Sequence, residues 1–420
     1  MGRRVERARR PYVPPVKRIE LSKENIKSRW IATILFLVVG LASIAVTLYV
    51  SLTPEAGWEE IKANASDTEN CSGEFSLVYH LGTGETSLSK EKKAIAGVYT
   101  AACETAHKLF HSTAEYEGVQ NIAYINSHPN ETVTVDPKLY KAFEQLENSG
   151  IRHQYMGPAY ETYNGVFYCR EEYQTADYDP LQNDELRAYF SEIAAFAADP
   201  EAVHLELLDE NRVCLRVSEA YLKFSEENET NRFLDLYWMK NAFIADFIAE
   251  QLTESGYTHG VLSSYDGFVR SMEDADSTDF RFILFDRKGN TVYPAATELY
   301  SGQRSMVYLR SYPASELDMR HYSLLSDGEI RVPYLDIADG LPKASVGGMA
   351  SSSKTLGCAE ILLSVLPNFV GDSFDEAQVL ELVNNGIDTV FCQDGVLSHT
   401  SPETRLVDVH PDETVVCITE

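Results

Sequence analysis

The residues best placed to do chemistry lie between Phe233 and Arg270, where polar side chains follow the ends of two apolar runs. The first run, Phe233–Leu236, leads into a polar and aromatic corner and then into a helix with one apolar face. The second run, Val261–Ser264, ends in an acidic loop. Loops at strand ends and helix N-termini offer free backbone N–H groups to ligands. The order of strand, corner, helix and strand therefore indicates a ligand-binding corner.

Other patterns of catalytic residues do not have the required spacing. His107 and His111 are four residues apart, which places two ligands on one helix face, but Lys108 stands where a zinc hydrolase of this pattern has its glutamate. The serines at 263–264 and 351–353 do not form the G-x-S-x-G turn of a serine hydrolase. We therefore expect neither a zinc hydrolase of this kind nor a serine hydrolase.

The elements that must position the corner mix helices and strands without strict alternation, which predicts an α+β fold. Apolar residues at helical spacing predict helices within 95–110, 139–146 (stopped at Gly150), 186–194, 243–252, 356–366 (ended by Pro367) and 377–383, with a short helix at 59–63. Apolar runs bounded by turn residues predict strands at 75–81, 203–208, 213–217, 233–236, 261–264, 280–285, 291–293, 305–310, 389–393 and 414–418.

An uncharged run of 22 residues, Ile31–Leu52, is long enough to cross a bilayer core of about 30 Å. Ten Lys or Arg precede it, and Glu55, Glu59 and Glu60 follow it, so the positive-inside rule places the N-terminus in the cytoplasm. The run is longer than the apolar part of a usual signal peptide, which favours an uncleaved anchor over the alternative, a cleaved signal. We therefore predict a single-pass protein of the cell membrane.

Charge and length divide the chain into four parts. We predict a basic cytoplasmic tail over 1–29, a transmembrane helix over 30–52, a linker over 53–73 and an extracytoplasmic domain over 74–420. The whole chain has a formal charge of −28 and residues 1–29 carry +7, which leaves −35 on the remainder. A surface this acidic argues against nucleic acid as a partner.

Cysteine and tyrosine usage says less about function. The seven cysteines match no zinc or haem pattern, and their odd number leaves at least one without a partner in the same chain. One or two disulfides are compatible with the sequence, but their pairing is not determined. Some of the 24 tyrosines should be exposed, which would suit a protein-binding surface.

Five spaced segments resemble the FAD:protein FMN transferase (ApbE-like) family, roughly over residues 75–395. They are 107–126, with His107–Phe110, Tyr116–Gly118 and Tyr124–Asn126; 157–161, with Gly157-Pro158; 234–246, with Leu234-Asp235-Leu236 and Ala245-Asp246; 333–342; and 349–358. Members of this family move FMN from FAD to a Ser or Thr hydroxyl of a target protein, with Mg²⁺, outside the cytoplasmic membrane. The resemblance implies a mixed-sheet α+β fold and a flavin-related site.

At the positions that the resemblance assigns to the nucleotide, this sequence departs from the family. Two family glycines, which let the backbone approach the nucleotide, are Tyr237 and Trp238 here. The family lysine falls on Asn241, one residue after Lys240. A second glycine pair falls on Tyr265 and Asp266.

The metal positions depart as well. The family's metal-binding Asp and Thr fall on Lys354 and Cys358, and its His falls on Pro333. A Lys ammonium repels Mg²⁺, and a thiol is a soft ligand that suits it poorly. Asp336, Gly340 and Pro342 are kept, but such residues also form turns.

These departures predict a non-catalytic binding or scaffold role at the cell surface, with cell-envelope or membrane proteins as partners and no bound flavin or metal. The alternative is a divergent active transferase that uses FAD and Mg²⁺, in which Asp246, Asp336 and a nearby carboxylate rebuild the cation site and Asp336 is catalytic. A purely structural ectodomain without a ligand is a third reading.

Overall fold

The computed structural model describes residues 26–52, 55–64, 69–84, 86–273, 279–315, 318 and 321–419. Most of the predicted basic tail, residues 1–25, lies outside these ranges. The chain forms two compact units, Met1–Pro54 and Glu55–Glu420. Within the described ranges, α1 (Ile26–Leu52) is the helix long and apolar enough to cross a membrane. This finding is consistent with either a membrane anchor or a signal peptide.

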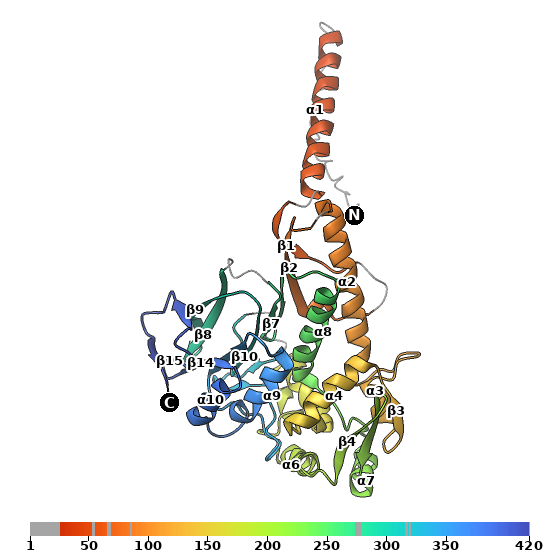
Figure 1. Ribbon diagram of the computed structural model, residues 1–420, viewed down its shortest axis with the longest axis vertical. Helices are drawn as coiled ribbons and strands as arrows, with labels where there is room; N and C mark the ends of the chain where they lie inside the picture. The colour runs from red at the N-terminus through yellow and green to blue at the C-terminus, as the bar shows by residue number, and fades with distance from the viewer. Residues whose placement is uncertain are drawn as a thin grey trace, which may run out of the picture. The chain divides into compact units, whose positions relative to one another are not determined.

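A nine-stranded sheet forms the centre of the second unit (Figure 1). Its strands, in spatial order, are β1 (Gly57–Ile61), β2 (Phe75–Leu81), β6 (Gly260–Ser264), β7 (Phe268–Ser271), β10 (Arg304–Arg310), β13 (Gly348–Ser353), β14 (Asp388–Gln393), β15 (Val396–His399) and β17 (Thr414–Cys417). Neighbouring strands are antiparallel except β15 and β17, which are parallel. The sheet is therefore mixed, and the predicted α+β class is confirmed.

Helices cover one face of this sheet. The long α2 (Leu88–Leu109) contacts β1 and β2, α8 (Lys240–Glu254) contacts β6 and β7, and α9 (Cys358–Phe369) contacts β10 and β13. α2 and α8 also pack against each other, and Figure 1 shows them side by side. The other helices are α3 (Ile122–Ser127), α4 (Pro137–Ser149), α5 (Gly157–Tyr163), α6 (Asp184–Ala198), α7 (Glu219–Glu227) and α10 (Glu376–Val383).

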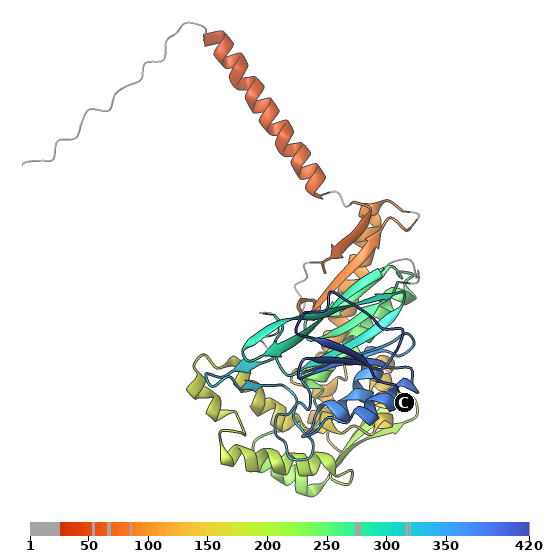
Figure 2. The same cartoon turned by 90° about the vertical axis from the view of Figure 1, so that its left-hand side faces the viewer.

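A small sheet covers the other face, and the two layers are seen from a second side in Figure 2. It consists of β16 (Arg405–Val407), β9 (Thr291–Ser301) and β8 (Asp279–Lys288). Successive side chains of β10 point to opposite faces of the nine-stranded sheet. Val307 and Leu309 therefore enter the core beneath the helices, whereas Tyr308 packs with Leu284 of β8. Separate sheets are formed by β3 (Thr132–Thr134), β5 (Arg212–Val217) and β4 (Val203–Leu208), and by β11 (Ser323–Leu324) and β12 (Ile330–Arg331).

The predicted strand at Phe233–Leu236 is wrong, because this segment pairs with none of the strands that the structure describes. It is buried, and its backbone bonds to the Asn126 side chain and to the carbonyl of Gln154 instead of a neighbouring strand. The Asn126 amide donates to the carbonyl of Leu234 at 2.8 Å and accepts from its N–H at 2.9 Å. One buried side chain thus satisfies both polar groups of Leu234.

Two other local predictions also fail. Residues 59–63 were predicted to be helical, but 57–61 form β1, which pairs with residues 77–81 of β2. Pairing with a distant strand overrides local propensity here. Pro367 does not end α9, which continues to Phe369. Since Pro367 lies in the last turn, it removes a single hydrogen bond, and burial of Leu366 and Phe369 holds the turn.

Candidate functional site

The predicted ligand corner lines a cleft of about 300 Å³ in the structure, which we call the corner cleft. Four of the residues predicted from the sequence, Tyr237, Trp238, Asn241 and Asp266, lie along it. Sequence reasoning did not single out the other lining residues as site residues; these are Glu74, Ser112, Asn164, Tyr168, Arg232, Asp235, Lys240 and His321. Residues from six separate places in the chain therefore meet at this corner.

Tyr237 occupies the turn between the 233–236 segment and α8. Its φ is +41°, in the left-handed region that glycine adopts most easily, and its N–H donates to Oδ1 of Asp235 at 2.8 Å. The ring stacks on Tyr160 with centroids 4.9 Å apart, and its hydroxyl donates to Asn164 at 3.0 Å. These contacts hold a large side chain where the backbone geometry favours glycine.

Trp238 closes the inner side of the cleft. Its side chain is buried and meets Tyr334 edge-on, with ring centroids 4.7 Å apart. The space left between Trp238, Asp266, Phe268, Tyr322 and Tyr334 is about 20 Å³, roughly the volume that a single water needs. Pro333, at the family's histidine position, also borders this gap.

The charged groups of the cleft pair with one another. Glu74 accepts from Lys240 at 3.3 Å and from the Asn241 amide at 2.9 Å, and the same amide donates to Asp266 at 2.8 Å. Arg232 lies 3.6 Å from Asp235 and 3.1 Å from Glu161. The cations of the cleft therefore already have carboxylate partners.

The pKa values of the cleft carboxyls follow from burial and from these partners. Burial raises the pKa of Asp235 and of Asp266 above the usual value for Asp. Burial also acts to raise the pKa of Glu74, but Lys240 and Asn241 more than offset this, and the pKa lies below its usual value. Glu74 is therefore the carboxylate most firmly charged in this network.

Asp246 faces away from the network, toward the start of α9. It accepts from the Arg270 guanidinium at 2.7 Å and from the N–H groups of Cys358 and Ala359 at 2.8 and 2.9 Å. Gly357, at the N-cap position of α9, has no side chain to do this. A Cβ on Gly357 would lie 2.4 Å from Oδ2 of Asp246. Asp246 therefore caps α9 from the neighbouring helix.

The other predicted residues are dispersed. The Lys354 side chain is 65% exposed, and its ion-pair partner in the structure is Glu403 at 3.9 Å. Cys358 is fully buried, with its thiol donating to the carbonyl of Val269 at 3.3 Å. Tyr265 is 40% exposed and does not line the cleft.

Asp336 is bound within its own turn. Its carboxylate accepts from Ala338 N at 2.9 Å and from Lys343 at 3.0 Å, and its carbonyl accepts from Gly340 N at 2.7 Å. Gly340 has φ +79°, and an added Cβ would lie 2.6 Å from the carbonyl oxygen of Phe190, so this position requires glycine. The Asp336–Gly340 pair thus forms a tight turn.

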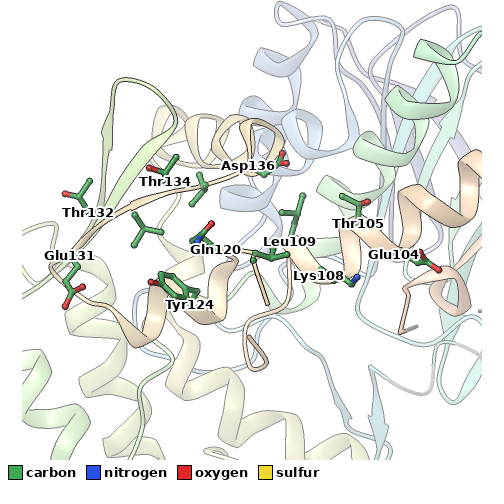
Figure 3. A pocket seen from close by; sticks show the side chains of 14 residues that line it. Glu104, Thr105, Lys108, Leu109, Gln120, Tyr124, Glu131, Thr132, Thr134 and Asp136 are labelled. Carbon is green, nitrogen blue, oxygen red and sulfur yellow. The ribbon is translucent and has the colours of Figure 1, made fainter. Parts of the chain in front are cut away.

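A larger cavity, of about 640 Å³, opens elsewhere, between the C-terminal end of α2 and β3. Figure 3 shows its lining, which includes Glu104, Lys108, Gln120 and Tyr124. None of the residues predicted from the sequence as site residues line it. His107 and His111 lie nearby on α2 but turn to Tyr116, to which His107 is hydrogen-bonded at 3.0 Å.

Comparison with solved structures shows that ApbE flavin transferases share this fold. The Vibrio cholerae flavin transferase ApbE matches with a TM-score of 0.53 at 11% identity, covering 84% of this chain and 97% of that one. The Thermotoga maritima ApbE protein matches with a TM-score of 0.52 at 15% identity, covering 83% and 96%. The apo Pseudomonas stutzeri flavinyl transferase ApbE gives 0.50 at 11%, covering 84% and 97%. No protein-family model and no curated protein matches the sequence. The second unit therefore has the ApbE-like fold, at low sequence identity.

The role of Asp246 can be tested by replacing Gly357 with alanine. We expect Gly357→Ala to lower the free energy of unfolding by about 1–3 kcal/mol, because the new Cβ displaces the capping carboxylate. Urea unfolding of the purified chain measures this. The control is Gly97→Ala in α2, where an added Cβ meets nothing within 4 Å and should stabilise by roughly 0.5–1 kcal/mol. A Gly357→Ala chain as stable as wild type would mean that Asp246 is not fixed at α9.

Proposed function

We propose that this chain is a membrane-anchored protein whose ApbE-like domain serves as a non-catalytic binding or scaffold module at the cell surface. One observation carries the proposal: Tyr237 and Trp238 fill the corner where the resemblance predicts a nucleotide. We propose further that α1 is an uncleaved anchor with the N-terminus in the cytoplasm, since the preceding segment is basic and α1 is long enough to span a bilayer.

The size of the corner cleft argues against FAD in the family manner. Its volume of about 300 Å³ is at the lower end of the roughly 300–1,000 Å³ of pockets for drug-sized ligands, and FAD is a large dinucleotide. The packed rings cannot move aside cheaply, because Tyr237 stacks on Tyr160 and Trp238 packs against Tyr334.

The charges of the corner cleft also argue against FAD binding. The diphosphate of FAD carries two negative charges and needs unpaired cations or free N–H groups. Lys240 is already paired with Glu74, and Arg232 with Glu161 and Asp235. The carboxylates of the cleft would in addition repel the diphosphate.

The residues at the metal positions do not fit Mg²⁺. Lys354 offers a cation in solvent, and Cys358 offers a buried thiol. The rebuilt site of the active alternative would need Asp246 and Asp336. Arg270 and the start of α9 engage the first, and Lys343 engages the second. We therefore derive no reaction step through FAD or Mg²⁺.

A protein-binding role is supported by exposed tyrosines in one chain segment, residues 164–178, which we call the tyrosine surface. Tyr168, Tyr173 and Tyr178 lie within residues 164–178, and Tyr168 also lines the cleft. The first two are 71% and 77% exposed. Exposed tyrosines are enriched at protein interfaces, because they supply rigid apolar area together with a hydroxyl.

The lack of transfer is tested by incubating the full chain, purified in detergent, with FAD and Mg²⁺. We expect no retention of FAD in equilibrium dialysis and no release of AMP, since the cleft has neither the volume nor the free cations. The Vibrio cholerae flavin transferase ApbE serves as the positive control. Saturable FAD binding with AMP release would refute the non-catalytic role and favour a divergent active transferase.

The partner is tested by placing a photo-crosslinking amino acid at Tyr173 in membranes of the native host. We expect a discrete crosslinked product containing a cell-envelope or membrane protein. The matched control is the same amino acid at Val383, which is also exposed but lies on α10. Equal crosslinking from both positions, or none from Tyr173, would contradict binding through the tyrosine surface.

A further inference from the structure

Three metal-ligating side chains converge at a place unrelated to the corner cleft. Asp286 lies on β8, Cys392 on β14, and Glu413 immediately before β17. One carboxylate oxygen from each acid and the Cys392 sulfur all lie within 4.8 Å of one another. The three residues come from sequence positions more than 100 apart at the extremes, so the fold itself brings them together.

One distance in the cluster, from Cys392 to Glu413, is close to that between two ligand atoms of a tetrahedral metal site. Zinc lies about 2.3 Å from a thiolate and about 2.0 Å from a carboxylate oxygen, so the two ligand atoms of a tetrahedron are about 3.5 Å apart. Cys392 Sγ lies 3.7 Å from Oε2 of Glu413. Tyr293 donates to the other oxygen, Oε1, at 2.7 Å, which orients the Glu413 carboxylate toward the sulfur. Second-sphere hydrogen bonds of this kind are common around metal ligands.

The two carboxylates lack a compensating cation in the described part of the chain. Asp286 is 8% exposed and Glu413 is 9% exposed, yet neither forms an ion pair with a described Lys or Arg. The two basic residues that follow Asp286 are engaged elsewhere: Lys288 pairs with Asp412 at 3.0 Å, and Arg287 donates to the carbonyl of Gly328 at 2.8 Å. Two buried acids beside a thiol are costly without a positive charge.

Two members of the cluster, Asp286 and Cys392, also border a cavity. A cavity of about 600 Å³ is lined by Asp286, Tyr293, Tyr312 and Cys392. A metal bound to three protein ligands at its wall would keep a fourth position for water or a ligand from solvent, as in open zinc sites.

We propose that Asp286, Cys392 and Glu413 bind a transition metal ion of the Zn²⁺ type. A thiolate ligand selects Zn²⁺ or Co²⁺ over Mg²⁺ and Ca²⁺, which prefer oxygen. Binding replaces the thiol proton: the S–H bond of Cys392 breaks, a sulfur–metal bond forms, and the proton goes to solvent. The ion ties β8, β14 and the segment before β17 together, and therefore stabilises the packing of the two sheets.

Cobalt is the most direct probe, because Co²⁺ replaces Zn²⁺ and a thiolate–Co²⁺ bond absorbs in the near ultraviolet. Full-length chain in detergent, stripped with EDTA, is titrated with Co²⁺ alone. We expect saturation at one ion per chain with a thiolate-to-cobalt band. Competing Zn²⁺ should remove the band, and Mg²⁺ at the same concentration should not.

Substitutions test which residues bind the metal ion. We expect Cys392→Ser to abolish the band, and Asp286→Asn and Glu413→Gln each to weaken Co²⁺ binding at least tenfold. The control is Cys214→Ser, another buried cysteine, which should keep the wild-type titration. Circular dichroism checks that each variant is folded, and the two nearly isosteric amide variants provide the test if Cys392→Ser is not.

The proposal is overturned if wild type shows no thiolate band, if Cys392→Ser keeps it, or if Mg²⁺ displaces Co²⁺ at equal concentration. It is equally overturned if the folded amide variants bind Co²⁺ as tightly as wild type. None of these outcomes depends on flavin, so the metal site and the non-catalytic role can fail separately.

Discussion

The packing of two aromatic rings at one backbone corner constrains the region around the corner cleft. Tyr237 takes up a left-handed conformation and is held there by Tyr160 and Asn164, while Trp238 is wedged against Tyr334. Because α8 begins directly after this turn, the rings also fix where Lys240 and Asn241 enter the cleft. A ligand bound at this corner could occupy only the space that the two rings leave.

The charged and polar residues around the filled corner bind one another. Asn241 lies between two acids and donates to both, and Lys240 neutralises the more strongly charged of them, Glu74. On the far side of α8, Asp246 joins Arg270 to the start of α9. Both sets of contacts give polar residues of the corner structural partners. The ApbE-like architecture is present at 11–15% identity, with these contacts in place at the corner.

Local sequence patterns predicted those parts of the fold that local forces decide. The strand at Phe75–Leu81 matches β2, and the helix expected to stop at Gly150 ends there, where φ is +71°. The sequence could not indicate that Leu234 would be satisfied by Asn126, 108 residues earlier, or that 57–61 would pair with β2. Such outcomes depend on long-range pairing, which has no local signature.

The site was predictable in the same uneven way. The corner was predicted from the order of apolar runs and helix, and four of its residues from the resemblance, because all of them lie in one continuous segment, 233–270. Glu74, which binds both Lys240 and Asn241, was missed because it lies 166 residues before Lys240 and has no motif of its own. Lys354 and Cys358 were paired by motif spacing, yet one side chain is in solvent and the other is buried. Spacing along a chain does not determine which way neighbouring side chains point.

The central claim, that Trp238 closes the corner to nucleotides, is tested most directly by the fluorescence of that residue. The chain has three tryptophans, so a Trp30→Phe, Trp58→Phe variant reports on Trp238 alone. We predict emission at short wavelength, weak quenching by acrylamide, and no change on adding FAD and Mg²⁺ after correction for light absorbed by the flavin. Strong acrylamide quenching, or a saturable change with FAD, would contradict a closed corner.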